Sequence, residues 1–444
     1  MKITKLALSA AIAATCLGGS VFAQAPVTPS KTYFGAGSAP ADYSAVIPAS
    51  CACGDAPVSC DAGCSGGCSD GSCDAGGCGL LGGGLFAGGC DSACGGCDSA
   101  CGGDEPWKLF QNPVAGFDVG GWAQLGWHSY NNSLFNKHAD NVNLHQAWLY
   151  AEKVADGSNG LGLGGRIDYI YGVDAQDTQA FGIANNHWDN SWDNGIYGHA
   201  MPQLYAEVAY GDVSVKVGHF FTLIGYEVVG ATGNFFYSHS YTMYNSEPFT
   251  HTGAVATYSA GDNLTLYGGY VMGWDSGFED NGDAFLGGFS YDLSDSVNVT
   301  NQLITGRFGE YANNEVGYML SSIMTTQVSD SLTHVLWVDI LDTDGTGRAR
   351  ERETFDVNNY LLYTLSDKLV WGNRLEWYNI DKGVYGVTAG RSDIYAFTTG
   401  LNYAASSNLL FRPELRWDWD KDGVAGNELG QSQTTVGADM IMTF

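Results

Sequence analysis

The sequence predicts an all-β fold: a transmembrane antiparallel up-and-down β-barrel of about 16 strands over residues 115–444. Apolar residues recur at every second position in segments of about ten, as expected for a wall with lipid outside and water inside. Tight turns alternate with long polar connections. After the N-terminus, no run approaches the roughly 20 apolar residues that a membrane-spanning helix requires.

Alternating segments recur along this region. In residues 161–171, Leu163 and Ile167 share one face, while Arg166 and Asp168 occupy the other. The same pattern is found in residues 117–127, 203–208, 213–217, 264–272, 369–377 and 409–418. Each segment therefore predicts a strand with one face toward lipid and one toward the barrel interior.

Two kinds of connection separate these segments. Tight turns are predicted at 211–212, 260–263, 294–296, 329–331, 366–368 and 404–408, and longer connections at 174–200, 226–249, 275–283, 342–353 and 420–431. Short turns belong on the periplasmic side of an outer-membrane barrel and long loops outside. The barrel is therefore expected to have an even number of strands, with both of its chain ends in the periplasm.

The C-terminus favours a membrane barrel over a soluble β-sandwich, in which alternation also occurs. Val436, Ala438, Met440, Met442 and Phe444 alternate up to the last residue. A terminal aromatic residue on such a strand is similar to the signal by which the barrel-assembly machinery recognises its substrates, so that machinery is an expected partner. The lipid bilayer is the other.

Three zones precede the barrel. Residues 1–23 have the basic start, apolar middle and small-residue end of a signal peptide, which indicates export to the bacterial outer membrane, and residues 24–50 form a linker. Cys16 lies within the apolar run and lacks a good lipobox. Residues 51–103 form a Gly/Cys-rich low-complexity segment with eleven cysteines.

Export favours disulfides or cross-linking to a cell-wall partner for these cysteines, while their short spacings also suit a metal and a disordered spacer is the simplest alternative. They are Cys51, Cys53, Cys60, Cys64, Cys68, Cys73, Cys78, Cys90, Cys94, Cys97 and Cys101. No haem-attachment motif occurs, and the sequence indicates no cofactor.

Ionisable residues on the predicted inner face are the candidate pore-lining residues, because they would set the field that a solute crosses. By alternation they are Arg166, Asp168, Glu207, Lys216, Arg374, Glu376, Arg412, Glu414, Arg416 and Asp418. Equal numbers of bases and acids predict weak ion selectivity. Alternatively, these residues pair across neighbouring strands and only stiffen the wall.

The connection 226–249 is unusually aromatic for an exposed loop. It either folds into the lumen as a constriction or packs on the barrel rim, and its candidate residues are Glu227, Phe235, Phe236, Tyr237, His239 and Glu247. Asp418, Asp420 and Asp422 have the alternating oxygen ligands of a calcium loop, but Glu428 falls one residue short of the closing carboxylate. No confident metal site follows.

Several motifs resemble the OmpL-like β-barrel porins, a family abundant in planctomycete bacteria. They are VKVGHFFTLIGYE at 215–227, NFFYSHSY at 234–241, EPFTHTG at 247–253 and RPELR at 412–416. The resemblance covers about the last three-quarters of the chain and implies a porin fold. It implies nothing about the solute or the Gly/Cys-rich segment.

The expected function is that of a porin allowing passive diffusion of small hydrophilic solutes or ions. One alternative is a structural protein anchored to the cell wall through the cysteines, and another is an outer-membrane enzyme, although no spacing of Ser and His identifies a nucleophile. The net charge of −29 argues against nucleic acid as a partner. A homo-oligomer is expected by analogy with general porins only.

Overall fold

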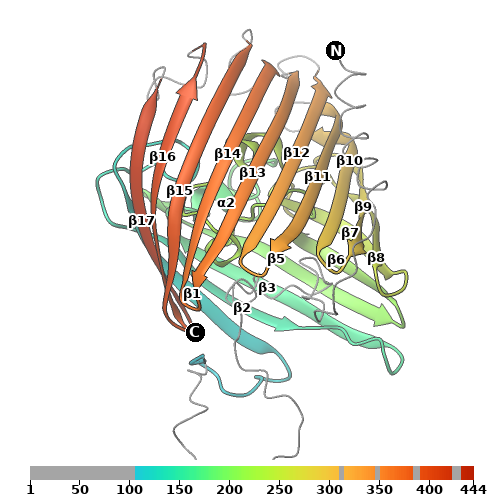
Figure 1. Cartoon of the computed structure of the whole chain (residues 1–444). Helices are drawn as coiled ribbons and strands as arrows, with labels where there is room; N and C mark the ends of the chain where they lie inside the picture. Colours follow the sequence, from blue (N-terminus) through green and yellow to red (C-terminus); the bar gives the residue numbers. More distant parts are fainter. Residues whose placement is uncertain (1–105, 310–314, 346–350, 384–390, 423–431) are drawn as a thin grey trace, which may run out of the picture. The chain divides into compact units, whose positions relative to one another are not determined.

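A computed structural model describes residues 106–309, 315–345, 351–383, 391–422 and 432–444, all within one compact unit (Figure 1). Almost all regular structure is β-strand. The strands are β1 (Asp118–His128), β2 (Asn143–Lys153), β3 (Gly162–Gly172), β4 (Asp193–Asn194), β5 (Tyr197–Tyr210), β6 (Val213–Phe221), β7 (Thr250–Ser259), β8 (Leu264–Val271), β9 (Asp283–Ser294), β10 (Val297–Gly309), β11 (Glu315–Ser329), β12 (Leu332–Asp344), β13 (Arg352–Ser366), β14 (Leu369–Lys382), β15 (Ser392–Ser406), β16 (Leu409–Asp420) and β17 (Gln433–Thr443).

The strands form a closed antiparallel barrel. Each long strand pairs with its neighbours in sequence, and β1 closes the wall against β17, from Trp122 opposite Thr443 to His128 opposite Gly437. The two-residue strand β4 pairs only with the first two residues of β5. The wall therefore has 16 strands, which confirms the predicted fold class and strand number.

Connection lengths alternate as predicted. Gly211 and Asp212 alone join β5 to β6, and the φ of +56° at Gly211 is a backbone conformation that glycine adopts without strain. Several strands are longer than predicted: β12 and β13 extend into the polar stretch 342–353, where Asp342 pairs with Glu353. Backbone pairing continues there because polar side chains do not interrupt a hydrogen-bonded ladder.

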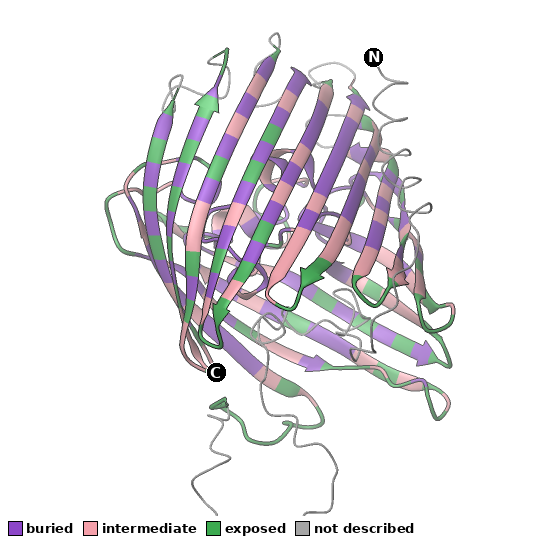
Figure 2. Ribbon diagram, viewed as in Figure 1, coloured by how far each residue is buried: buried purple, intermediate pink, exposed green. Residues whose placement is uncertain are grey.

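The two faces of each strand differ in burial, and Figure 2 shows the resulting bands along the wall. On β16, Arg412 and Arg416 are buried, while Phe411, Leu415 and Trp417 are exposed. The apolar side chains face outward because lipid is their solvent, and the charged ones face inward. On β17, Val436 and Met442 are exposed, as the terminal alternation predicted.

Helices are short. Among the described residues they are α2 (Ala175–Thr178), α3 (Tyr241–Ser246) and the 3₁₀ turn η2 (Ala231–Gly233). Ser240 caps α3, its hydroxyl oxygen accepting the Met243 N–H at 3.1 Å. No helix in the part of the chain that the structure describes is long and apolar enough to cross a membrane.

Candidate functional site: the barrel interior

The predicted pore-lining residues lie on the inward face. Nine of the ten are buried, and Lys216 is half-buried. They come from β3, β5 and β6 on one side of the barrel and from β14 and β16 on the other. The wall strands themselves therefore bring these residues toward a shared interior.

The connection 222–249, called here the inserted segment, crosses that interior. It leaves the wall at β6 and returns at β7, yet it contacts β13, β14 and β16, on the far side of the 16-stranded ring. It carries the six residues predicted for a constriction. All six are buried.

Residues of β14 hold the inserted segment by charge. Arg374 pairs with Glu227 and donates to the Ser238 carbonyl oxygen at 2.9 Å. Glu376 accepts backbone N–H groups from Tyr241 at 3.1 Å and Thr242 at 2.8 Å. Backbone polar groups of the inserted segment, which is buried away from water, are satisfied in this way.

Residues of β16 hold it in the same manner. Arg412 donates to the carbonyl oxygens of Ala231 at 3.0 Å and Asn234 at 2.6 Å, and it is also paired with Asp439 of β17. Glu414 accepts the Tyr237 N–H at 3.0 Å. The wall charges on this side thus bind protein backbone as well as each other.

Arg416 completes this set. It donates to the carbonyl oxygen of His239 at 2.5 Å and is paired with Asp418 at 2.8 Å. Asp418, one of the three candidate calcium ligands, is therefore already paired with an arginine. Asp420, another candidate, accepts a hydrogen bond from the Ser392 hydroxyl at 2.5 Å. Among the described residues, no group of three or more His, Cys, Asp or Glu side chains could hold a metal ion.

The carboxyl group of Glu227 is buried. Burial by itself would raise its pKa, but Arg374 and the hydrogen bonds from Ser240 and Tyr360 bring the pKa below its usual value. The carboxylate is therefore the form that holds the inserted segment to β14. Removal of its partner would leave a buried unpaired charge.

A second contact joins the inserted segment to β1 and β2. Gln146 donates to the Val229 carbonyl oxygen at 2.8 Å and accepts the Ala231 N–H at 2.9 Å. The Tyr237 hydroxyl lies 2.7 Å from Nε2 of His145 and 3.1 Å from Nδ1 of His128. Sequence reasoning missed these residues because histidine and glutamine carry no net charge that alternation would single out.

Aromatic packing fills the space between these polar contacts. Phe235, Phe236 and Phe249 of the inserted segment join a buried cluster with Trp122 of β1 and Trp337 of β12. The cluster includes residues from both sides of the barrel. It fills part of the lumen with side chains.

Gly372 of β14 makes room for one of these rings. A Cβ atom at this inward position would lie 2.1 Å from a ring carbon of Phe235. Such a contact is far shorter than van der Waals packing allows. The absence of a side chain at Gly372 thus determines where Phe235 packs.

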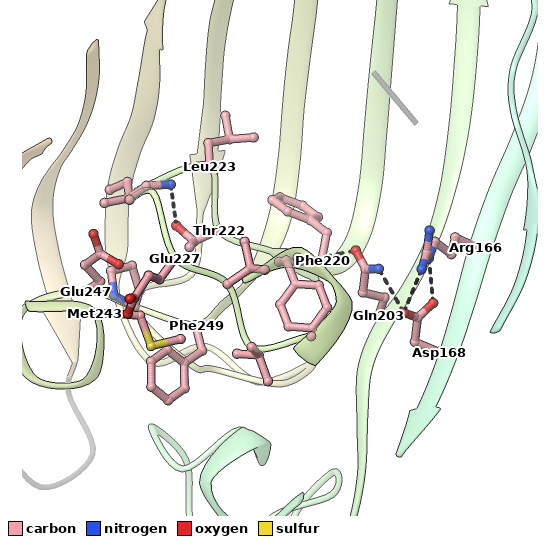
Figure 3. Close-up of a pocket in the computed structure, with 18 of the residues that line it drawn as sticks. Arg166, Asp168, Gln203, Phe220, Thr222, Leu223, Glu227, Met243, Glu247 and Phe249 are labelled. Carbon is pink, nitrogen blue, oxygen red and sulfur yellow. Dashed lines mark hydrogen bonds and ion pairs between the residues drawn. The ribbon is translucent and has the colours of Figure 1, made fainter. Parts of the chain in front are cut away.

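A cavity of about 160 Å³ remains between the inserted segment and the wall from β1 to β8 (Figure 3). Phe220, Leu223 and Phe249 contribute apolar surface. Arg166 and Asp168 lie toward one side in this view, and Glu227 and Glu247 toward the other. This cavity leaves space in the interior for a small molecule.

The buried charges are far from balanced. Among the described residues, buried charged side chains comprise 17 carboxyl groups and 4 arginines. Several carboxyl groups that alternation did not single out, such as Glu152, Asp339, Asp356 and Asp439, account for part of the excess. Asp339 and Asp356 were obscured by apolar neighbours on both faces of β12 and β13, whereas the parity of the last strand could have identified Asp439.

The predicted signal peptide, the linker and all cysteines lie outside the described residues, so their predicted roles remain predictions. The same applies to Glu428 at the end of the partial calcium loop. Histidines that could have suggested catalysis lie in hydrogen bonds: His219 contacts Thr252 at 2.8 Å, and His251 contacts Thr222 at 3.0 Å.

A closed antiparallel wall with apolar residues outside and charged residues inside defines an outer-membrane β-barrel protein. The chain belongs to the family described as "Putative beta-barrel porin-2, OmpL-like", whose model matches residues 116–444. This is the family that the sequence motifs indicated, and it places the protein in the bacterial outer membrane. Among curated proteins, none is similar in sequence to this chain.

Solved porin-like barrels share the fold. OmpT, an outer membrane protein of Vibrio cholerae, aligns with a TM-score of 0.52 and 13% identity over 76% of this chain and 100% of its own. An anion-selective porin from Comamonas acidovorans aligns with a TM-score of 0.51 and 12% identity over 74% and 99% of the two chains. At these identities the similarity concerns the fold alone.

Proposed function

We propose that this protein is a passive porin that admits small hydrophilic solutes and ions through a lumen narrowed by the inserted segment, with a preference for cations. The proposal is supported by the family, by the barrel size and by the position of the segment across the interior. No chemical step is assigned to the barrel.

The preference for cations rests on one observation, the 17 buried carboxyl groups against 4 buried arginines. Charges in a narrow lumen act strongly on a permeating ion, because the walls around the lumen have a low dielectric constant and focus the field. Protonation of some carboxyl groups reduces the imbalance but does not reverse its sign. The balanced wall inferred from alternation covered only the ten predicted residues.

The test is single-channel recording of the purified full chain in a planar bilayer, followed by the reversal potential in a KCl gradient. We expect discrete conductance steps and a reversal potential of the sign that K⁺ selectivity gives. A folded barrel without conductance would contradict the porin, and preferential Cl⁻ passage would contradict the cation preference alone.

We also infer that residues 1–23 direct export and that Phe444 is read by the assembly machinery. The position of Phe444 supports this role, since its backbone pairs with Gly121 where β1 and β17 close the barrel. Deletion of Phe444 should lower the amount of folded barrel in the outer membrane, measured by heat-modifiable migration in gels.

A further inference from the structure

The cavity beside the inserted segment combines apolar surface with charged groups at its margins. Its apolar lining includes Trp148 of β2, Phe220 of β6, Tyr267 of β8, and Leu223 with Phe249 of the inserted segment. Aromatic faces of this kind attract organic cations as well as apolar groups. Its volume of about 160 Å³ suits a body the size of one benzene ring.

The basic residues at one margin do not make the cavity positive. Arg166 is paired with Asp168 at 2.6 Å and with Glu152 at 2.9 Å. Lys216 lies directly across from Glu207 in the pairing of β5 and β6. These five groups comprise two positive and three negative charges, so their formal sum is negative.

The opposite margin is acidic. Glu247 lines the cavity, and its carboxyl group hydrogen-bonds to that of Asp339 on β12. A hydrogen bond between two carboxyl groups requires a proton on one of them. Burial, together with Asp339 and the further carboxyl groups of Glu227 and Asp356, raises the pKa of Glu247 well above its usual value.

No base in the described part of the chain neutralises this pair. Neither Glu247 nor Asp339 takes part in an ion pair with another described residue, although Glu227 nearby is paired with Arg374. Gly225, with a φ of +92°, lies against the Glu247 carboxyl group, because a Cβ atom there would be 2.2 Å from its oxygens. The carboxyl group is thus held beside the apolar part of the cavity.

We propose that this cavity is a binding subsite for a small organic ammonium ion with a compact apolar or aromatic body, whose ammonium group is anchored by Glu247, with Asp339 behind it. The ammonium donates a hydrogen bond to the Glu247 carboxylate, and the proton that Glu247 shares with Asp339 passes to the buffer. The apolar body lies against Phe220, Leu223 and Phe249. The proposal deepens the proposed function by naming a solute class for the cation-preferring lumen.

Binding of three ring compounds to the full chain in detergent micelles tests the subsite by calorimetry. Benzylamine is the probe, benzyl alcohol is its neutral counterpart and benzoate its anionic one, with empty micelles correcting for partition. We expect benzylamine to bind at least about tenfold more tightly than benzyl alcohol, since a charge-assisted hydrogen bond is worth that factor or more. Benzoate is expected to bind most weakly, and benzylamine binding should release a proton.

Two variants locate the site. Glu247→Gln should remove the preference for benzylamine over benzyl alcohol, and Thr257→Phe, on the β7 wall of the cavity, should reduce the binding of both by filling the space. Asp212→Asn, in the exposed turn between β5 and β6, is the matched control and should leave binding unchanged. Thr257→Phe keeps the test decisive if Glu247→Gln fails to fold.

Three results would overturn the subsite: no benzylamine binding, benzoate binding as tight as benzylamine, or benzylamine binding that Thr257→Phe leaves intact. Because binding is measured without a membrane potential, its failure is distinct from that of the porin. Conductance without binding overturns the subsite alone, and binding without conductance overturns the porin.

Discussion

The two sides of the barrel interior use inward-facing positions differently. On β14 and β16, arginine and glutamate side chains bind the backbone of the inserted segment, as Arg374 and Glu376 do. On β6 to β8, inward residues such as Thr257 and Tyr267 leave a cavity beside the same segment. The side of β14 and β16 therefore holds the inserted segment in place, and the side of β6 to β8 determines the size of the cavity.

This difference shows that charged residues on the inner wall have two different roles. A buried arginine that donates to backbone carbonyl groups stabilises the inserted segment, whereas a carboxyl group without a basic partner is available to the proposed solute. Alternation along a strand predicts that residues of both kinds line the pore. The following experiments distinguish the two roles, from the largest expected effect to the smallest.

Loss of a charge that holds the inserted segment should have the largest effect on the free energy of unfolding. Arg374→Met leaves Glu227 buried without its ion-pair partner, which should lower the free energy of unfolding by about 3–5 kcal/mol. Lys216→Met on the cavity side removes no ion pair with a described residue and should cost less than about 1 kcal/mol. Denaturant titration in detergent measures both, and equal losses would contradict the distinction between the two sides.

A side chain at the position where Phe235 packs against β14 should have an intermediate effect on stability. Gly372→Leu forces this ring from its place against β14 and should destabilise the barrel by about 1–3 kcal/mol. Gly268→Ala, facing outward on β8, is the control, since its Cβ atom would lie 3.9 Å from the nearest side-chain atom. Unfolding midpoints report the change; an unaltered midpoint in Gly372→Leu would show that the segment is not packed this tightly.

Filling the cavity should change conductance more than stability. Thr257→Trp places a ring in the cavity and should lower single-channel conductance, because the proposed solute path includes that space. Thr398→Val is the comparison and should alter conductance less. Thr398 lies on the inward face of β15, on the side of the barrel that holds the inserted segment. Equal conductance in wild type and Thr257→Trp would place the path elsewhere in the lumen.

A pH effect is expected where the inserted segment rejoins the wall. Asp275 accepts the N–H groups of Phe249 at 3.0 Å and Thr250 at 2.9 Å, and burial raises its pKa to about 7, although these bonds and Arg352 oppose the rise. A carboxyl group with a raised pKa is more readily protonated in the folded state. Its contribution to stability is therefore full below the unfolded value and declines as pH rises toward about 7.

Hydrogen exchange at the amides of Phe249 and Thr250 measures this effect. After correction for intrinsic exchange, protection should fall as pH rises from about 4 to about 7. Asp275→Asn should remove the dependence, since its amide does not titrate. A dependence that persists in the variant would show that another group is responsible.

Much of the wall could be predicted from the sequence. The 16 strands, the tight turn at Gly211 and the outward face of the last strand all follow from patterns within about ten residues. Lipid outside and polar groups inside impose the alternation on every strand separately. Local sequence is sufficient for such features.

The site was less accessible to prediction. The aromatic composition of the inserted segment suggested a constriction but left a rim location open, because composition does not specify what an aromatic ring packs against. The contacts of Arg412 with Ala231 and Asn234 join residues 181 and 178 positions apart, to which no local pattern refers.

The sequence by itself thus determined the barrel, its membrane and its family, since each depends on repeated local patterns and short motifs. Only the tertiary structure decided that the segment between Phe221 and Thr250 crosses the interior, and that Asp339 meets Glu247 beside a cavity. The physical reason is that strand pairing is encoded residue by residue along neighbouring strands, whereas docking of the segment depends on side chains that only closure of the barrel brings together.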